Sequence, residues 1–269
     1  MIIDFHTHVF PDKIAQKTID FLAEKGGSPY YANGTVQGLL TALEKAGASI
    51  GVALPVLTKP EQFESVLNYV TALNENFSTQ GLKIISFAGI HPKCTDIKGK
   101  LLKVKELGFK GVKIHPDYQD TFFDDEGYVE ILKCAKELDL IVVTHAGVDV
   151  AYKNQEPKCL PSLIKKVIEK VGHNKLVLAH FGSSQMVNEF LDLVAGENVY
   201  IDTALVLKHL SFEDFNKVLK KHGEDKILFA SDSPWSDIES DVNIVKNFVK
   251  DKNVLNKILY QNAEKLLGI

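Results

Sequence analysis

Two kinds of hydrophobic pattern alternate along this chain. Short apolar runs rich in β-branched residues predict strands, and longer segments with apolar residues every three or four positions predict amphipathic helices. The predicted strands cover residues 1–6, 49–56, 83–90, 111–115, 140–145, 175–180, 199–204 and 226–232. The clearest predicted helices cover residues 61–77, 126–139, 160–172 and 211–223. Strands and helices therefore alternate from one end of the chain to the other.

This alternation predicts a single α/β domain. Near-continuous apolar strands indicate burial on both faces, as in a parallel sheet covered by helices. Eight such units in 269 residues predict a (β/α)8 TIM barrel that spans residues 1–269. An open, doubly wound sheet is the alternative. Residues 253–269 predict a C-terminal helix packed on the barrel.

Composition and charge narrow the class of protein. The chain is 45% hydrophobic with a net charge of -4, and without a basic stripe the sequence disfavours nucleic acid as a partner. It begins without the pattern of a signal peptide, and no apolar stretch approaches the roughly 18 residues of a membrane span. Cys94, Cys134 and Cys159 lack CxxC spacing and predict reduced thiols. We expect a cytoplasmic protein with a small-molecule substrate and no membrane partner, and the sequence is compatible with a homodimer.

The histidines gather where the predicted strands end. Six of the nine lie at such ends, namely His6, His8, His91, His115, His145 and His180. The other three, His173, His209 and His222, lie elsewhere, and Asp232 ends the eighth strand. The carboxyl ends of barrel strands are where TIM barrels place their active sites. This distribution predicts a site at that face.

The spacing of these residues predicts a metal site. His6 and His8 lie two residues apart on a strand, so their side chains share a face. His145 and Asp232 can complete a His3Asp ligand set with one coordination position open for water. We expect one divalent ion, with Zn2+ preferred and Mn2+, Fe2+, Co2+ or Ni2+ also compatible. Asp4 follows the same alternation, which predicts a place behind the ligands or in the barrel interior.

Several motifs resemble those of a known enzyme group. "DFHTH", "VVTHAG", "VLAHFG" and "FASDSPW" resemble the amidohydrolase superfamily of metal-dependent TIM-barrel hydrolases. "GFKGVKIHP" and "ILYQNAEKLLG" resemble its branch that includes aminocarboxymuconate-semialdehyde decarboxylase. The resemblance implies that His6, His8, His145 and Asp232 bind one metal ion and that His180 is catalytic. TatD-like nucleases usually carry Glu where this chain has "VKIHPDY", which disfavours that alternative.

Four further residues are candidates for substrate binding, and each has an alternative role. Lys113 and His115 can both face the barrel interior, where Lys113 contacts a substrate anion and His115 lines the pocket. In other branches of the superfamily a lysine on the fourth strand is carboxylated and bridges two metal ions. His91 either contacts substrate or caps a turn, and Trp235 either packs at the rim or forms a pocket wall.

These residues predict a metal-dependent hydrolase that acts on a small amide, lactone or ester through a metal-activated water. Asp232 would accept the proton of the water, and His180 would exchange a proton with the reacting group. Decarboxylation of a small unsaturated acid fits the same scaffold, but the sequence lacks an Arg-rich carboxylate clamp. A barrel that binds a metal or a ligand without turnover is the remaining alternative. An open metal position and a poised acid/base argue against it.

Overall fold

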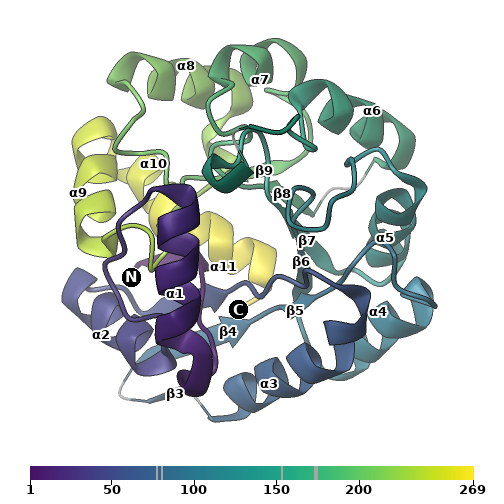
Figure 1. Ribbon diagram of the computed structural model, residues 1–269. Coiled ribbons are helices and arrows are strands. Elements are labelled where there is room, and N and C mark those ends of the chain that lie inside the picture. Colours follow the sequence, from purple (N-terminus) through teal and green to yellow (C-terminus); the bar gives the residue numbers. More distant parts are fainter. Residues whose placement is uncertain (77, 80, 153, 173–174) are drawn as a thin grey trace.

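The computed structural model describes residues 1–76, 78–79, 81–152, 154–172 and 175–269, so His173 lies outside the described residues. Parallel strands form a ring with helices around it (Figure 1). These strands are β1 (Ile3–Thr7), β2 (Ile50–Ala53), β4 (Leu82–Ser86), β5 (Ala88–Gly89), β6 (Gly111–Ile114), β7 (Ile141–Thr144), β8 (Leu176–Leu178), β9 (Tyr200–Asp202) and β10 (Ile227–Leu228). β4 and β5 together occupy the place of the third predicted strand. A short β3 (Ser78–Thr79), which the pattern did not predict, pairs antiparallel with β4.

Hydrogen bonds between β1 with the residue after it and the segment that follows β10 close the ring. One sheet has the order β1-β2-β4-β3 and the other β10-β9-β8-β7-β6-β5. β5 follows β4 directly in the chain, which joins the sheets on one side. On the other side the Phe5 amide donates to the Phe229 carbonyl at 2.9 Å, and the His8 amide donates to the Ser233 carbonyl at 2.7 Å. The predicted (β/α)8 barrel is therefore confirmed, and the open sheet is excluded.

Amphipathic helices form the outer layer of the barrel (Figure 1), and four of them cover the predicted segments 61–77, 126–139, 160–172 and 211–223. This layer consists of α2 (Val36–Ala46), α3 (Phe63–Asn76), α4 (Ile97–Glu106), α5 (Glu126–Glu137), α6 (Pro161–Val171), α7 (Val187–Leu193), α8 (Phe212–His222) and α9 (Ile238–Phe248). Their apolar faces pack on the outer faces of the strands in one large cluster. None of the helices in the described part of the chain is long and apolar enough to cross a membrane.

Two helical segments lie outside this ring. α1 (Asp12–Gly26) lies in front of the barrel in Figure 1 and packs against η2 (Val150–Tyr152), which follows β7. The C-terminal segment consists of α10 (Lys252–Asn256), the π-helical η4 (Lys257–Gln261) and α11 (Asn262–Leu267). It confirms the predicted terminal helix, although the structure divides it into three parts.

The interior of the barrel is filled by apolar side chains from the lower parts of the strands. Ile3 and Phe5 of β1 pack in this cluster with Leu266 and Leu267 of α11. α11 therefore forms the floor of the barrel at the amino ends of the strands, and the polar strand-end residues lie above the apolar layer.

Candidate active site

A β-bulge in β1 sets the direction of the first histidine pair. Asp4 pairs with Gly51 and Thr7 pairs with Ala53. The two pairs are therefore three residues apart in β1 but only two residues apart in β2. Paired residues of parallel strands face the same side, and Gly51 and Ala53 are two apart. Asp4 and Thr7 therefore share one face, and His6 between them turns to the other.

Asp4 consequently does not share the face of His6, which corrects the expectation from strict alternation. The Asp4 carboxylate accepts hydrogen bonds from the hydroxyl and the amide of Ser231. It also accepts one from the amide of His6 at 3.2 Å. Asp4 thus lies behind the site and ties β1 to the segment that follows β10.

The two histidine rings are oriented by acceptors behind them. His6 Nδ1 lies 2.8 Å from Asp202 Oδ2, and His8 Nδ1 lies 2.8 Å from the Leu54 carbonyl oxygen. A carbonyl or a carboxylate only accepts, so each Nδ1 carries the proton of its neutral ring. Both Nε2 atoms then hold lone pairs, and these atoms face each other at 3.2 Å.

Asp232 adds a carboxylate oxygen to this pair. Its Oδ1 lies 3.0 Å from His8 Nε2 and 3.4 Å from His6 Nε2. Burial raises the pKa of Asp232, but the neighbouring His6 and His8 hold it below its ordinary value. Two imidazole lone pairs and a carboxylate oxygen converge here, and this donor set suits a divalent ion such as Zn2+. The residues therefore fit the predicted metal.

Lys113 reaches the same place from β6. Its side chain is 1% exposed, and its Nζ lies 3.2 Å from His6 Nε2. Burial lowers the pKa of Lys113 to about 8. The amine thus donates to the nitrogen lone pair that a metal ion would use. This position is compatible with a substrate-anion contact and with a carboxylated lysine, so both alternatives stay open.

A second group lies beside the first. One ligand atom each from His115, His145 and Asp149 lies within 4.8 Å of the others. His115 Nε2 is 3.2 Å from Asp149 Oδ2, and the rings of His115 and His145 stack with centroids 4.3 Å apart. His145 Nε2 is buried and has no hydrogen-bond partner among the described residues. The structure thus groups His145 with His115, and its role as a ligand beside His6 and His8 stays a prediction.

His180 lies between these two groups. Its ring centroid is 4.6 Å from that of His145 and 5.5 Å from that of His6. Its Nδ1 lies 3.0 Å from the Ala204 carbonyl oxygen, which fixes the proton on Nδ1 and leaves Nε2 with a lone pair. His180 and Asp232 have φ of 58° and 69°, a left-handed backbone that is uncommon outside glycine. Such backbone is concentrated at functional sites.

Two carboxylates of the site were not identified from the sequence. Asp202 ends β9 and holds the ring of His6, while Asp149 follows β7 in a loop and pairs with His115. Asp202 stands at the end of an apolar strand, as the strand-end histidines do, and this signal could have revealed it. Asp149 lies in a loop, where no strand-end pattern marks it.

The remaining candidates lie near the rim. His91 Nδ1 accepts a hydrogen bond from the Lys93 amide at 3.1 Å, so His91 caps its turn, as one alternative stated. Trp235 is partly exposed and follows the Asp232 turn, where its amide donates to the Asp232 carbonyl at 2.8 Å. Neither contact tests substrate binding.

Aromatic rings continue from the second group towards α1. Tyr118 stacks on His115 with centroids 4.1 Å apart, and Tyr152 lies 5.3 Å from Tyr118. The amine of Lys25 on α1 lies 3.6 Å from the centre of the Tyr152 ring. α1 and η2 therefore flank the carboxyl-end face of the barrel near the histidines.

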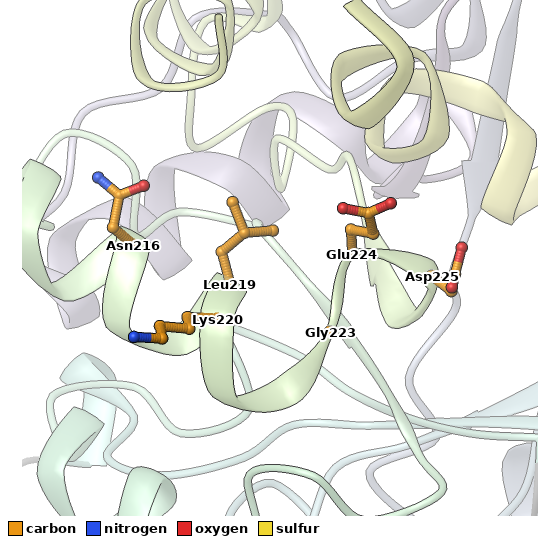
Figure 2. A pocket seen from close by; sticks show the side chains of 6 residues that line it. All are labelled: Asn216, Leu219, Lys220, Gly223, Glu224 and Asp225. Atoms are coloured by element: carbon orange, nitrogen blue, oxygen red, sulfur yellow. The ribbon is translucent and has the colours of Figure 1, made fainter. Parts of the chain in front are cut away.

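A surface hollow elsewhere has no connection with these residues. Figure 2 shows it between α8 and η3 (Glu224–Lys226), lined by Asn216, Leu219, Lys220, Gly223, Glu224 and Asp225. η3 leads into the amino end of β10, so the hollow lies at the opposite end of the barrel from the histidines. We assign it no role.

Comparison with known proteins supports this architecture. A model of the Amidohydro_2 amidohydrolase family matches residues 3–269. No curated protein matches the chain. Several solved structures match over nearly the whole length of both chains, although each is less than a fifth identical in sequence and therefore speaks for the fold alone.

Three of these structures show the range of structural similarity and of protein type among the matches. An uncharacterised TIM-barrel protein from Bordetella bronchiseptica has a TM-score of 0.77 at 17% identity, with 99% of this chain and 98% of that chain covered. A dihydroxybenzoic acid decarboxylase from Polaromonas with bound manganese and an inhibitor has a TM-score of 0.69 at 15% identity, covering 99% and 96%. A probable 2-pyrone-4,6-dicarboxylic acid hydrolase from Acinetobacter baumannii has a TM-score of 0.65 at 18% identity, covering 100% and 99%.

Proposed function

The chain belongs to the amidohydrolase family, and on that premise we propose that it is a metal-dependent hydrolase of small amides, lactones or esters. The observation that carries this proposal is the convergence of His6 Nε2, His8 Nε2 and Asp232 Oδ1 at the carboxyl end of the barrel. An ionised carboxylate beside two imidazole Nε2 atoms suits a site that activates water.

The proposed ligands are His6, His8 and Asp232, with His145 as the fourth because its buried Nε2 has no other partner in the described chain. A bound divalent ion would supply Lewis acidity, which lowers the pKa of bound water to about 7 and polarises a carbonyl group. We propose Zn2+ for this imidazole-rich set, with Mn2+, Fe2+, Co2+ and Ni2+ as alternatives.

The chain's own residues would move the protons. The Asp232 carboxylate would accept a proton from the attacking water, since its low pKa keeps it ionised at neutral pH. His180 Nε2, which holds a lone pair, would take over this proton from Asp232 and deliver it to the leaving group. Lys113 and His115 are the proposed substrate contacts inside the barrel, and His91 and Trp235 those at its rim.

A substrate panel with isotope labelling tests the proposal. Esters, lactones and amides of small acids are incubated in oxygen-18 water with the metal-loaded protein. The masses of the products are then measured by mass spectrometry. We expect one labelled oxygen in the acid product. The His6→Ala/His8→Ala protein is the matched control and should release no labelled acid. Hydrolysis at the same rate by wild type and by this variant would refute the proposal.

Decarboxylation of a small unsaturated carboxylic acid is the second candidate. It is favoured by the fold likeness to several solved decarboxylases and by the amine of Lys113 beside the proposed ligands. The chain contains no arginine, so a lysine would have to neutralise the carboxylate of the substrate. Release of carbon dioxide, with solvent deuterium on the product carbon, would replace the hydrolase proposal with this one.

A further inference from the structure

Asp202 connects the proposed metal ligand His6 to the proposed acid/base His180. Its side chain is fully buried at the end of β9. Oδ2 accepts from His6 Nδ1 at 2.8 Å, while Oδ1 accepts from the amides of His180 at 2.9 Å and Ala204 at 3.1 Å. Three donors thus point at one carboxylate from three strand ends.

This carboxylate determines which nitrogen of His6 is free. With the proton held on Nδ1, the Nε2 lone pair faces His8 and Asp232. The opposite tautomer would place a hydrogen on Nε2 and close that atom to a metal ion. The same carboxylate holds the amide of His180, whose φ of 58° directs the chain through a left-handed turn.

We propose that Asp202 is a positioning residue that sets the tautomer of His6 and the backbone turn of His180 together. The proposal rests on the proposed metal-dependent function, but it concerns the proton on His6 and needs no particular reaction. One buried group would then prepare both the metal ligand and the acid/base.

An Asp202→Asn substitution isolates this role, because the amide has the size of the carboxylate but carries donors on one side. If its NH2 faces His6, the ring must accept through Nδ1 and carry its proton on Nε2. If its NH2 instead faces His180 and Ala204, two buried backbone donors lose their acceptor. In neither orientation are all three hydrogen bonds retained with the proton on His6 Nδ1.

Asp4→Asn is the matched control. Asp4 is also fully buried and also accepts from three donors, but none of them is a ring nitrogen. Both variants should lose some thermal stability. Only Asp202→Asn should change metal affinity.

The first measurement is the affinity for Zn2+ and Co2+ in competition with a chromophoric chelator. We expect Asp202→Asn to bind roughly 10–100-fold more weakly, the usual effect of removing the partner behind a ligating histidine. Asp4→Asn should bind both ions as wild type does, because no ring nitrogen donates to Asp4. Equal losses in both variants, or no loss in Asp202→Asn, would overturn the proposal.

The second measurement uses wild-type protein and so does not depend on whether an Asp202 variant folds. Nitrogen-15 NMR of histidine-labelled, metal-free wild type reports which ring nitrogen is protonated, and a His6→Gln spectrum assigns the signal. We expect protonated Nδ1 and bare Nε2 in His6. Protonated Nε2 would refute the positioning role. Failure of wild type to bind any metal would instead refute the proposed function and leave this result standing.

Discussion

The two histidine groups at the top of the barrel contain the same residue types but hold their protons differently. In the first group, His6 and His8 donate outward to Asp202 and the Leu54 carbonyl, which leaves their Nε2 atoms facing inward. In the second group, His115 pairs with Asp149 inside the group itself. The partner behind a ring decides whether that ring offers a lone pair to a metal ion or a proton to a neighbour.

The pKa shifts of His6 and His115 support the same distinction between the two groups. Burial lowers the pKa of His6 well below its usual value, and Lys113 lowers it further, so this ring stays neutral and able to bind a cation. Burial also lowers the pKa of His115, although Asp149 opposes that shift. The His115–Asp149 pair is therefore satisfied without an ion. We infer that the first group binds the metal together with His145, and that His115 and Asp149 form the wall beside it.

Removing the first pair should have the largest effect. We expect wild type to carry about one ion per chain and the His6→Ala/His8→Ala protein to bind it more than about 100-fold more weakly, beyond the loss typical of outer partners. The matched His115→Ala/Asp149→Ala protein should keep its metal. Elemental analysis of protein never exposed to chelator measures both.

The reverse outcome, with metal lost only from the second variant, would exchange the roles of the two groups. Two ions per wild-type chain would favour the carboxylated form of Lys113, because a bridging carboxylate is then needed beside His6.

His180 should separate activity from metal binding. We expect His180→Ala to keep its ion and lose activity by roughly 10²–10⁴-fold, the usual range for an acid/base group. Turnover and metal content are measured on the same sample. Joint loss of metal and activity would make His180 a ligand and extend the first group towards the second.

Asp232→Asn tests the carboxylate of the first group. The amide keeps one oxygen for the ion but loses charge and basicity, so affinity should weaken and turnover at saturating metal should fall by at least about 10²-fold. Activity is compared with occupancy across a metal titration. Near-normal turnover once the site is full would mean that Asp232 is only a ligand, and His180 would then be the first candidate for the general base.

Asp149→Asn should have the smallest effect. The amide oxygen can still accept from His115, so only the charge of the acceptor is lost, at a cost of about 1 kcal/mol, or roughly fivefold. We expect KM for the substrate to rise roughly fivefold, with the metal content unchanged. A large fall in metal content would show that the second group also supports the ion.

Much of the fold followed from the hydrophobic pattern, because helix and strand periods are local properties of the chain. The predicted helices at 126–139 and 160–172 correspond to α5 and α6. α1 was not identified, since its Ile14 and Phe21 are exposed and its pattern does not point to a core. The place of the site was predictable as well, because the carboxyl ends of parallel strands meet at one face.

The orientation of the site residues was less predictable. The bulge in β1 turns Asp4 and His6 to different faces of the strand. A regular two-residue alternation does not predict such a bulge. The bond from His6 to Asp202 joins positions far apart in the chain, and the sequence does not show which acceptor lies behind a ring. The grouping of His145 with His115 likewise depends on side-chain directions after the strands end.

The floor of the barrel has a consequence for synthesis of the protein. Ile3 and Phe5 of β1 pack with Leu266 and Leu267 of α11, which is synthesised long after β1. Until α11 leaves the ribosome, the growing chain cannot seal its interior, and the apolar side chains of β1 stay open to water and to other chains. Contacts between such distant positions slow folding and lengthen this exposure. Folding of this barrel can therefore be completed only after α11 has been made.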